Sequence, residues 1–218
     1  MPSLSQLLAA HAPLLLLDAS ATRVQVGWLG ERNVSGGQTA SRWENSDDEA
    51  GVGVFRGVEQ LGRNPHDAGA FVFCDGPGSV LGIRTTAMAL RTWGAVSPRP
   101  IFAYHSLALV AQALGRCDVA VIADARRDAW HHFTLGGTLR RVPTAELSGE
   151  FVMPENFRHW SPLPAGVTRV PYSLADLFPR VVDADLFRAT DAPEAFLHEE
   201  PSYVTWTPQI HRAPSDLG

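Results

Sequence analysis

Residues 72–93 read Val-Phe-Cys-Asp-Gly-Pro-Gly-Ser-Val-Leu-Gly-Ile-Arg-Thr-Thr-Ala-Met-Ala-Leu-Arg-Thr-Trp, and this stretch decides the fold. An apolar strand over 71–74 runs into a tight loop, and a helix is expected over 79–93. Two glycines around a proline suit a chain that turns sharply off a strand and exposes N–H groups at a helix start. Such a loop can hold a phosphate or simply join two packed elements. Ser79 is placed to cap the helix.

Outward from this joint, apolar runs alternate with helical patterns, which predicts an α/β fold. A helix is expected over 49–62, ended by Gly62, because its first turn is acidic and its apolar residues share neighbouring faces. The segment 143–171 is rich in proline and glycine and is expected to be irregular. Further strands are predicted at 14–17, 24–28, 101–104, 119–122, 130–135 and 201–210, and further helical patterns at 106–114 and 174–187, the latter interrupted by Pro179.

The chain carries one internal echo. An apolar strand that ends in Asp18 returns as a second strand after five residues, and the strand that ends in Asp124 does the same. This pattern suggests two similar αβ lobes, although a chance likeness between two hairpins remains the alternative. Ser-Pro-Arg-Pro at 97–100 breaks the pattern, so we expect an N-terminal lobe over 1–98 and a C-terminal lobe over 99–218.

Composition narrows the classes of function. The chain has 218 residues, a net charge of −5 and a pI near 5.9, which argues against strong direct binding of nucleic acid. Cys74 and Cys117 are expected to be ordinary small hydrophobes in a reducing cytoplasm. No apolar run approaches the roughly 18 residues of a membrane span, and Met1–Ala12 lacks the basic start of a signal peptide.

The polar motifs do not assemble an evident catalytic centre. The turn with Asp18, Ser20 and Thr22 could orient a metal-bound water or meet a phosphate, but an Asx turn bonded to its own backbone is the favoured interpretation. The 75–79 loop lacks the lysine of a P-loop and the pattern of a nucleophile elbow. His131 and His132 are adjacent on a predicted strand and point to opposite faces, so we expect no metal site there. Since none of these motifs assembles a catalytic group, we also expect no cofactor and no catalytic residue.

The apolar faces of helices 49–62 and 79–93 allow two interpretations. They can pack only on their own sheet, which physical reasoning alone favours, or they can also form a surface for a partner. The side chains proposed for such an interface are Val54, Phe55, Val58, Leu61, Ile83, Ala87 and Leu90.

Several blocks together resemble the TsaB (YeaZ) family, in the family's order and at similar spacing. They are the run from Leu14 to Trp28, the block Asp75-Gly-Pro-Gly-Ser-Val-Leu-Gly82-Ile-Arg84, the run from Tyr104 to Ala111, the segment 124–126 and the closing 201–204. The resemblance spans roughly residues 14–206 and is weakest from 140 to 195. The residues 45–49, Leu81 and Thr205 depart from the family pattern, which also permits a divergent paralogue.

The resemblance implies a duplicated actin/Hsp70-like (ASKHA, ribonuclease H-like) fold in a bacterial cytoplasmic protein. It implies a non-catalytic scaffold that pairs with a TsaD-like protein, joined by a TsaE-like ATPase, for N6-threonylcarbamoyladenosine modification at position 37 of tRNA. The tRNA would be met only through the complex, and a homodimer is also open. The family's peptidase M22 (glycoprotease) label is historical, and the family's interface lies on helices that correspond to 49–62 and 79–93.

Two rivals remain. An active ASKHA-type ATPase or phosphotransferase would use the Asp18 and Asp124 turns around a magnesium nucleotide, and an M22-like peptidase ranks third because no triad or metal motif is recognisable. The residues proposed for a degenerate nucleotide site are Asp18, Ser20, Thr22 and Asp124, and those of the structural loop are Asp75, Gly76, Pro77, Gly78, Ser79, Gly82 and Arg84.

Overall fold

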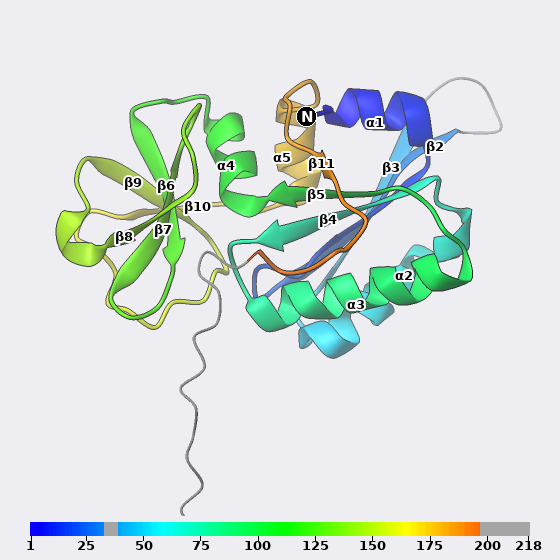
Figure 1. Cartoon of the computed structure of the whole chain (residues 1–218), viewed down its shortest axis with the longest axis horizontal. Coiled ribbons are helices and arrows are strands. Elements are labelled where there is room, and N and C mark those ends of the chain that lie inside the picture. The colour runs from blue at the N-terminus through cyan, green and yellow to red at the C-terminus, as the bar shows by residue number, and fades with distance from the viewer. Residues whose placement is uncertain (33–38, 197–218) are drawn as a thin grey trace, which may run out of the picture.

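The computed structural model describes residues 1–32 and 39–196, and the strand predicted at 201–210 lies outside this range. Figure 1 shows two sheets side by side: the first contains β1 to β5 and β11, and the second contains β6 to β10. The strands are β1 Leu14–Asp18, β2 Val24–Arg32, β3 Thr39–Ser46, β4 Ala70–Gly76, β5 Ile101–His105, β6 Val119–Asp124, β7 Ala129–Thr134, β8 Arg140–Pro143, β9 Glu150–Pro154, β10 Thr168–Val170 and β11 Arg188–Ala189. The helices are α1 Leu4–His11, α2 Ala50–Leu61, α3 Val80–Val96, α4 Ser106–Leu114 and α5 Leu174–Arg180, with short 3-10 turns at Pro65–Asp67 and Thr144–Glu146.

The two sheets repeat the same strand pattern. The first runs β11-β5-β4-β1-β2-β3 and the second β10-β9-β6-β7-β8. Within each, the first hairpin is antiparallel (β1 with β2, β6 with β7), and its leading strand lies parallel to a later strand (β4, β9). Each of these later strands in turn lies parallel to another, β5 in the first sheet and β10 in the second. The two-lobed α/β fold expected from the echo between the Asp18 and Asp124 hairpins is confirmed.

The centre of the first sheet is buried on both faces, because β1 and β4 are apolar apart from Asp18 and Asp75 near their ends. Alternate residues of β1 point to opposite sides, so Leu15 and Leu17 pack under α2 and α3 while Leu14 and Leu16 join a second core. That second core also contains α4, α5 and much of the second sheet. The two lobes therefore share one continuous hydrophobic cluster on this side of the first sheet.

The helices predicted at 49–62, 79–93 and 106–114 are confirmed, but α3 continues to Val96 and the first turn of α2 contains no acidic residue. Gly62 adopts the left-handed conformation after α2, with φ of 62°, and Ser79 caps α3 by accepting a hydrogen bond from the Gly82 N–H. In Figure 1, α2 and α3 lie together along one face of the first sheet, below β1 and β4.

The structure differs from the sequence-based predictions in several places. No strand was predicted at β3 or β11. The predictions also missed α1, which Ser3 caps through a capping box with Gln6. The segment 143–171, expected to be irregular, contains β9 and β10, although its connections are irregular. The helical pattern over 174–187 forms a helix only as far as Arg180. Pro179 is accommodated in the last turn, but proline disfavours continuation of the helix beyond it.

The first sheet contains strands from both of the predicted lobes, 1–98 and 99–218. These bounds therefore remain a prediction. β5 pairs with β4 and β11 pairs with β5, so both strands complete the first sheet although they follow residue 98. Among the described residues, no helix is both long and apolar enough to cross a bilayer.

Candidate functional site

Asp18 ends β1 as the most buried charged group of the β1–β2 turn, and its carboxylate is fully engaged. Oδ1 accepts hydrogen bonds from the Ser20 N–H at 2.8 Å and the Ser20 hydroxyl at 2.7 Å. Oδ2 accepts from the hydroxyls of Tyr104 at 2.6 Å and Tyr172 at 2.7 Å. Burial, reinforced by the charge of Asp18, raises the pKa of both tyrosines well above the ordinary value, so both stay protonated donors. The Asx turn is the interpretation that this geometry supports.

Asp124, at the equivalent end of β6, is held mainly by backbone N–H groups. Oδ1 accepts from the Arg126 N–H at 2.5 Å, and Oδ2 accepts from the N–H groups of Trp160 and Ser161, each at 2.7 Å. Burial pushes the pKa of Asp124 upward, but these N–H donors outweigh it and lower the pKa. Asp124 therefore ties the β6–β7 turn to the segment that follows β9.

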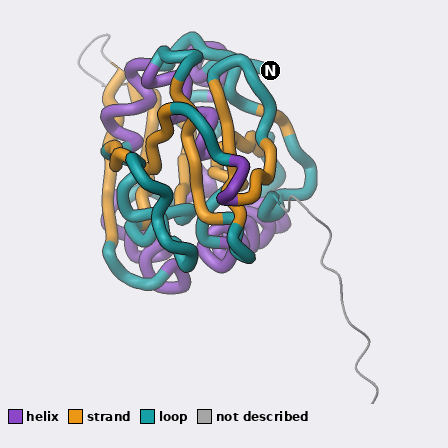
Figure 2. Tube along the Cα trace, turned by 90° about the vertical axis from the view of Figure 1, so that its left-hand side faces the viewer, coloured by secondary structure: helices purple, strands orange, loops and turns teal. Residues whose placement is uncertain are grey.

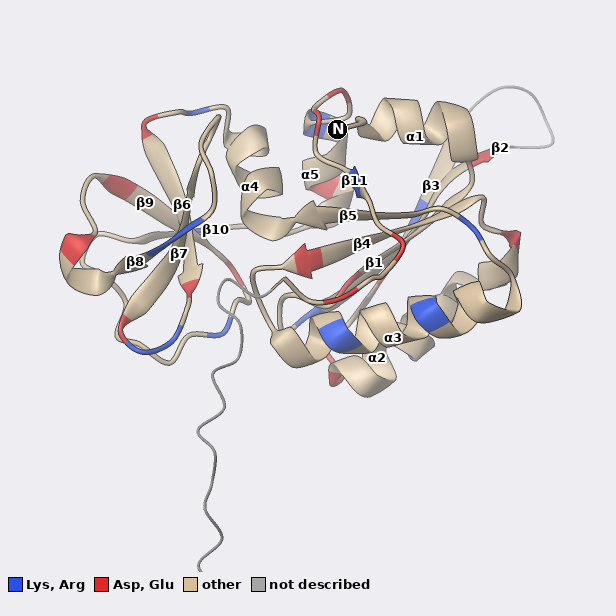
Figure 3. Cartoon of the chain, in the orientation of Figure 1, with Lys and Arg blue, Asp and Glu red and all other residues tan. Residues whose placement is uncertain are grey.

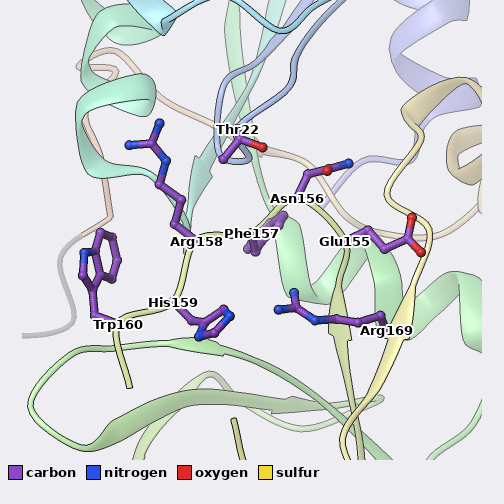
Figure 4. A pocket seen from close by; sticks show the side chains of 8 residues that line it. All are labelled: Thr22, Glu155, Asn156, Phe157, Arg158, His159, Trp160 and Arg169. Atoms are coloured by element: carbon purple, nitrogen blue, oxygen red, sulfur yellow. The ribbon is translucent and has the colours of Figure 1, made fainter. Parts of the chain in front are cut away.

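Ser20 and Thr22 face different surroundings. The Ser20 side chain is buried and its carbonyl accepts from the Ser79 N–H at 2.7 Å, while Thr22 is exposed and its N–H donates to the Asn156 carbonyl at 2.7 Å. The last bond joins the hairpin turn of the first lobe to the second lobe. Of the four residues proposed for a nucleotide site, Thr22 lines open pockets, one of which is shown in Figure 4.

The 75–79 loop is a joint packed against the β1–β2 turn. A Cβ on Gly78 would lie 2.4 Å from the Ser20 carbonyl oxygen, and one on Gly82 would lie 2.0 Å from that of Ala19, so only glycine permits this approach. Gly76 has φ of 125° and is joined to Pro77 by a cis peptide bond. The Ser79 N–H donates to the Ser20 carbonyl, and the Ser79 hydroxyl accepts from the Gly82 N–H, so both groups are bonded within the loop and its helix. This favours a structural role for the loop over phosphate binding.

Asp75 and Arg84 connect this joint to the last described segment. The buried carboxylate of Asp75 lies 2.8 Å from Nδ1 of His105 and accepts from Arg188 at 2.6 Å. Arg84 is exposed and lies 3.7 Å from Glu194. These groups hold the strand β11 and the residues after it against the first sheet.

The residue list of the predicted partner surface needs correction. Phe55 is half exposed, but the other six side chains lie in the core between the first sheet and its two helices, where no partner can touch them in this conformation. They point inward because the i, i+4, i+7 spacing of Ile83, Ala87 and Leu90 is the face that covers β1 and β4. The buried six are Val54, Val58, Leu61, Ile83, Ala87 and Leu90.

The same two helices nevertheless present apolar side chains to solvent. Nine large hydrophobic residues are exposed in the described part of the chain, and six of them belong to α2 and α3. Leu81 and Met88, with 77% and 61% of their surface exposed, are seven residues apart and share one face. Their seven-residue spacing, on the side of the helix opposite the core face, is the feature of the sequence that could have identified these exposed residues. We call this set the α2–α3 surface: Val52, Phe55, Val80, Leu81, Met88 and Val96.

No metal-binding cluster of His, Cys, Asp and Glu occurs within residues 1–32 and 39–196. His132 and His131 lie on β7 opposite Arg140 and Arg141 of β8. Burial and the charge of Arg140 lower the pKa of His132.

No protein-family model matches the chain, and no curated protein matches it significantly. Among solved structures, a Pseudomonas aeruginosa protein described as similar to the peptidase YeaZ shares 22% identity with a TM-score of 0.53, covering 72% of this chain and 84% of that one. YeaZ from Pseudomonas aeruginosa shares 23% identity with a TM-score of 0.50, covering 65% of this chain and 75% of that one. At this identity the likeness concerns the fold alone: the chain shares its two-lobed α/β architecture with YeaZ structures.

Proposed function

We propose that the chain is a non-catalytic subunit that pairs with a TsaD-like protein and supports threonylcarbamoylation of tRNA adenosine 37. The YeaZ-like fold motivates the class of complex. Because the chain carries a net charge of −5, the partner rather than this subunit would supply the surface for tRNA.

The observation that carries the proposal is the α2–α3 surface. Exposed apolar side chains that gather on two adjacent helices are typical of a binding interface, whereas scattered ones are ordinary. Figure 3 shows that α2 and α3 carry few charged residues. In the sequence these are Arg56 and Glu59 on α2 and Arg84 and Arg91 on α3. Phe55 contacts Trp93 edge-on at 6.2 Å between ring centroids, which fixes the exposed aromatic ring at the seam of the two helices.

The state of the two turn aspartates favours a non-catalytic role over an ATPase or phosphotransferase. Asp18 accepts four hydrogen bonds from protein donors and Asp124 accepts three, so neither is free to position a metal-bound water without rearrangement. The peptidase alternative would need a nucleophile with a neighbouring base, and the polar residues described above do not form such a pair.

Reconstitution tests the proposal. The purified chain, the TsaD-like protein and the TsaE-like ATPase of the same organism are combined with unmodified tRNA, ATP and threonylcarbamoyl-AMP as the donor of the transferred group, and modified adenosine is measured by mass spectrometry of the nucleosides. We expect modification to depend on the chain and to fall with Leu81→Asp, while Arg127→Gln, in the distant β6–β7 turn, leaves it unchanged.

Two results would contradict the proposal. Modification that proceeds equally without the chain would remove the scaffold role. Turnover of magnesium-ATP by the isolated chain, lost in Asp18→Ala, would favour the phosphotransferase alternative.

A further inference from the structure

The last described segment of the chain crosses α3 beside the α2–α3 surface. After β11, residues 190–196 run above α3 toward the end at which the helix begins (Figure 1). Pro193 and Ala195 are buried, whereas Glu194 between them is exposed. Such alternation is typical of an extended segment that packs one of its sides on the protein. We call residues 190–196 the strap.

Both ends of the strap are bound to the first sheet. At its beginning, the Thr190 N–H donates to the Ile101 carbonyl at 2.9 Å, which continues the pairing of β11 with β5. At its end, the Phe196 N–H donates to the Asp75 carbonyl at 2.7 Å. The buried carboxylate of Asp75 also accepts from Arg188, just before the strap. The backbone of the strap is therefore fixed at two points outside its middle.

In the middle of the strap, Glu194 contacts two arginines of α3. Its carboxylate accepts a hydrogen bond from Arg91 at 3.0 Å and lies 3.7 Å from the guanidinium of Arg84. All three side chains are about half exposed, with 44% to 53% of their surface accessible. Ion pairs at this exposure contribute little to the stability of a fold. Their main consequence is for the surface that α3 presents.

The two arginines belong to the same stripe of α3 as its exposed apolar side chains. Residues 81, 84, 88 and 91 follow one another at intervals of three and four, which places them in one row along the helix. Leu81 and Met88, both strongly exposed, thus alternate with Arg84 and Arg91. A guanidinium group that is covered by a partner without a carboxylate loses its hydration uncompensated, and this opposes binding. Glu194 supplies a carboxylate from within the chain.

We propose that the strap is a built-in part of the partner-binding surface, in which Glu194 holds Arg84 and Arg91 so that a largely apolar face of the partner can cover the stripe. The inference rests on the proposed function, because it names the chemistry of the face that the partner presents to α3. In the alternative arrangement, the partner brings its own carboxylates and displaces Glu194 from both arginines. The anchored ends of the strap favour the first arrangement, since they keep Glu194 beside α3.

Calorimetric titration of the full chain with the TsaD-like protein tests the sign of this effect. Glu194→Gln removes the charge and keeps the size of the side chain. We expect it to weaken the complex about fivefold, because two guanidinium groups are then covered without a carboxylate. Glu150→Gln is the matched control: it removes an exposed carboxylate from Arg116 in the second lobe, and the affinity should stay within about twofold of the wild type.

A rescue variant separates the effect of charge from a displacement of the strap. When Arg84→Met and Arg91→Met are added to Glu194→Gln, no guanidinium group of the stripe is left unpaired, and we expect the affinity to return to within about twofold of the wild type. In the isolated chain, hydrogen exchange of the strap should change by about threefold or less in Glu194→Gln, because its bonds to the first sheet remain. Circular dichroism confirms that each variant is folded.

The outcomes distinguish this inference from the proposed function. Equal or tighter binding by Glu194→Gln, an equal loss in Glu150→Gln, or no recovery in the rescue variant would overturn the inference alone. A strap that exchanges freely in the wild-type chain would also overturn it, because the surface would then not be built in. Absence of any complex with the wild-type chain would overturn the proposed function and this inference together.

Discussion

The two lobes repeat one arrangement of strands but connect them differently. In the first lobe, α2 leads from β3 to β4 and α3 leads from β4 to β5, whereas in the second lobe a 3-10 turn and an irregular segment take their places. Viewed from the side of the second sheet, strands and loops fill most of the near surface (Figure 2). The helical connections cover a core and present an apolar outer surface, while the irregular connection presents arginine, histidine and tryptophan at a pocket. One scaffold thus carries two different kinds of surface.

The hairpin turns show the same divergence. Asp18 is buried and bound by hydroxyl groups, and Asp124 is more exposed and bound by backbone N–H groups. An aspartate at the end of the leading strand serves both lobes as an anchor, but it anchors the interior in one and a surface segment in the other.

The largest expected effect comes from the core side of α3. Leu90→Asp places a charge in the cluster between α3 and the first sheet, and we expect a loss of roughly 4 kcal/mol or more in the free energy of unfolding. Met88→Asp, on the exposed side of the same helix, should change it by about 0.5 kcal/mol or less. Urea unfolding followed by circular dichroism measures both, and equal effects would contradict the division of α3 into a core face and an outer face.

The close approach of α3 to the β1–β2 turn is tested by Gly82→Ala. The new methyl group would collide with the Ala19 carbonyl, and displacing this backbone is expected to cost about 3 kcal/mol. Gly94→Ala, which meets open space on the same helix, should be neutral or stabilise by up to about 1 kcal/mol because alanine favours the helix. If Gly82→Ala proved as mild as its control in thermal melting, the joint would be looser than the structure has it.

The two anchors are compared by replacing each aspartate with asparagine. Asp18→Asn weakens the bonds from Tyr104 and Tyr172 in a buried place, so we expect a loss of about 2–3 kcal/mol. Asp124→Asn, in a more exposed turn, should cost about 1 kcal/mol. Equal losses in chemical denaturation would show that burial does not separate the two turns.

The smallest effect is a dependence on pH. The pKa of Asp124 is lowered in the folded chain, so its carboxylate contributes stability that is fully present above the unfolded value of about 3.9 and is lost as pH falls through the lower folded value. The stability advantage of the wild-type chain over Asp124→Asn should therefore shrink below about pH 4. An advantage that grows toward acid in parallel melting series would reverse the sign of this account.

Local patterns were sufficient for most of the fold. The apolar run before Asp18, the glycine after α2 and the Ser79 cap each predicted an element that the structure contains. The strand β9 was hidden because it has only five residues and ends in proline, which leaves too little alternation to separate it from a loop. The similar strand patterns that end in Asp18 and Asp124 predicted two similar lobes. They did not indicate that the second lobe lacks counterparts of α2 and α3.

The candidate sites were harder to predict than the fold. Helical periodicity correctly indicated that one face of α3 is apolar. The residues predicted for a partner interface were taken from this face, but in the structure it packs against the first sheet. The pocket where the second lobe borders the β1–β2 turn is lined by Thr22, Arg158 and Arg169. Thr22 and Arg169 are roughly 150 residues apart in the sequence, and no spacing rule connects them.

The most direct test of the proposed role is the affinity of the purified chain for the TsaD-like protein of the same organism, measured by calorimetry. The account predicts a stable heterodimer that is weakened about tenfold or more by Met88→Asp or Leu81→Asp and is unaffected by Arg127→Gln. No complex, or a complex that tolerates both substitutions on α3 in folded variants, would contradict it.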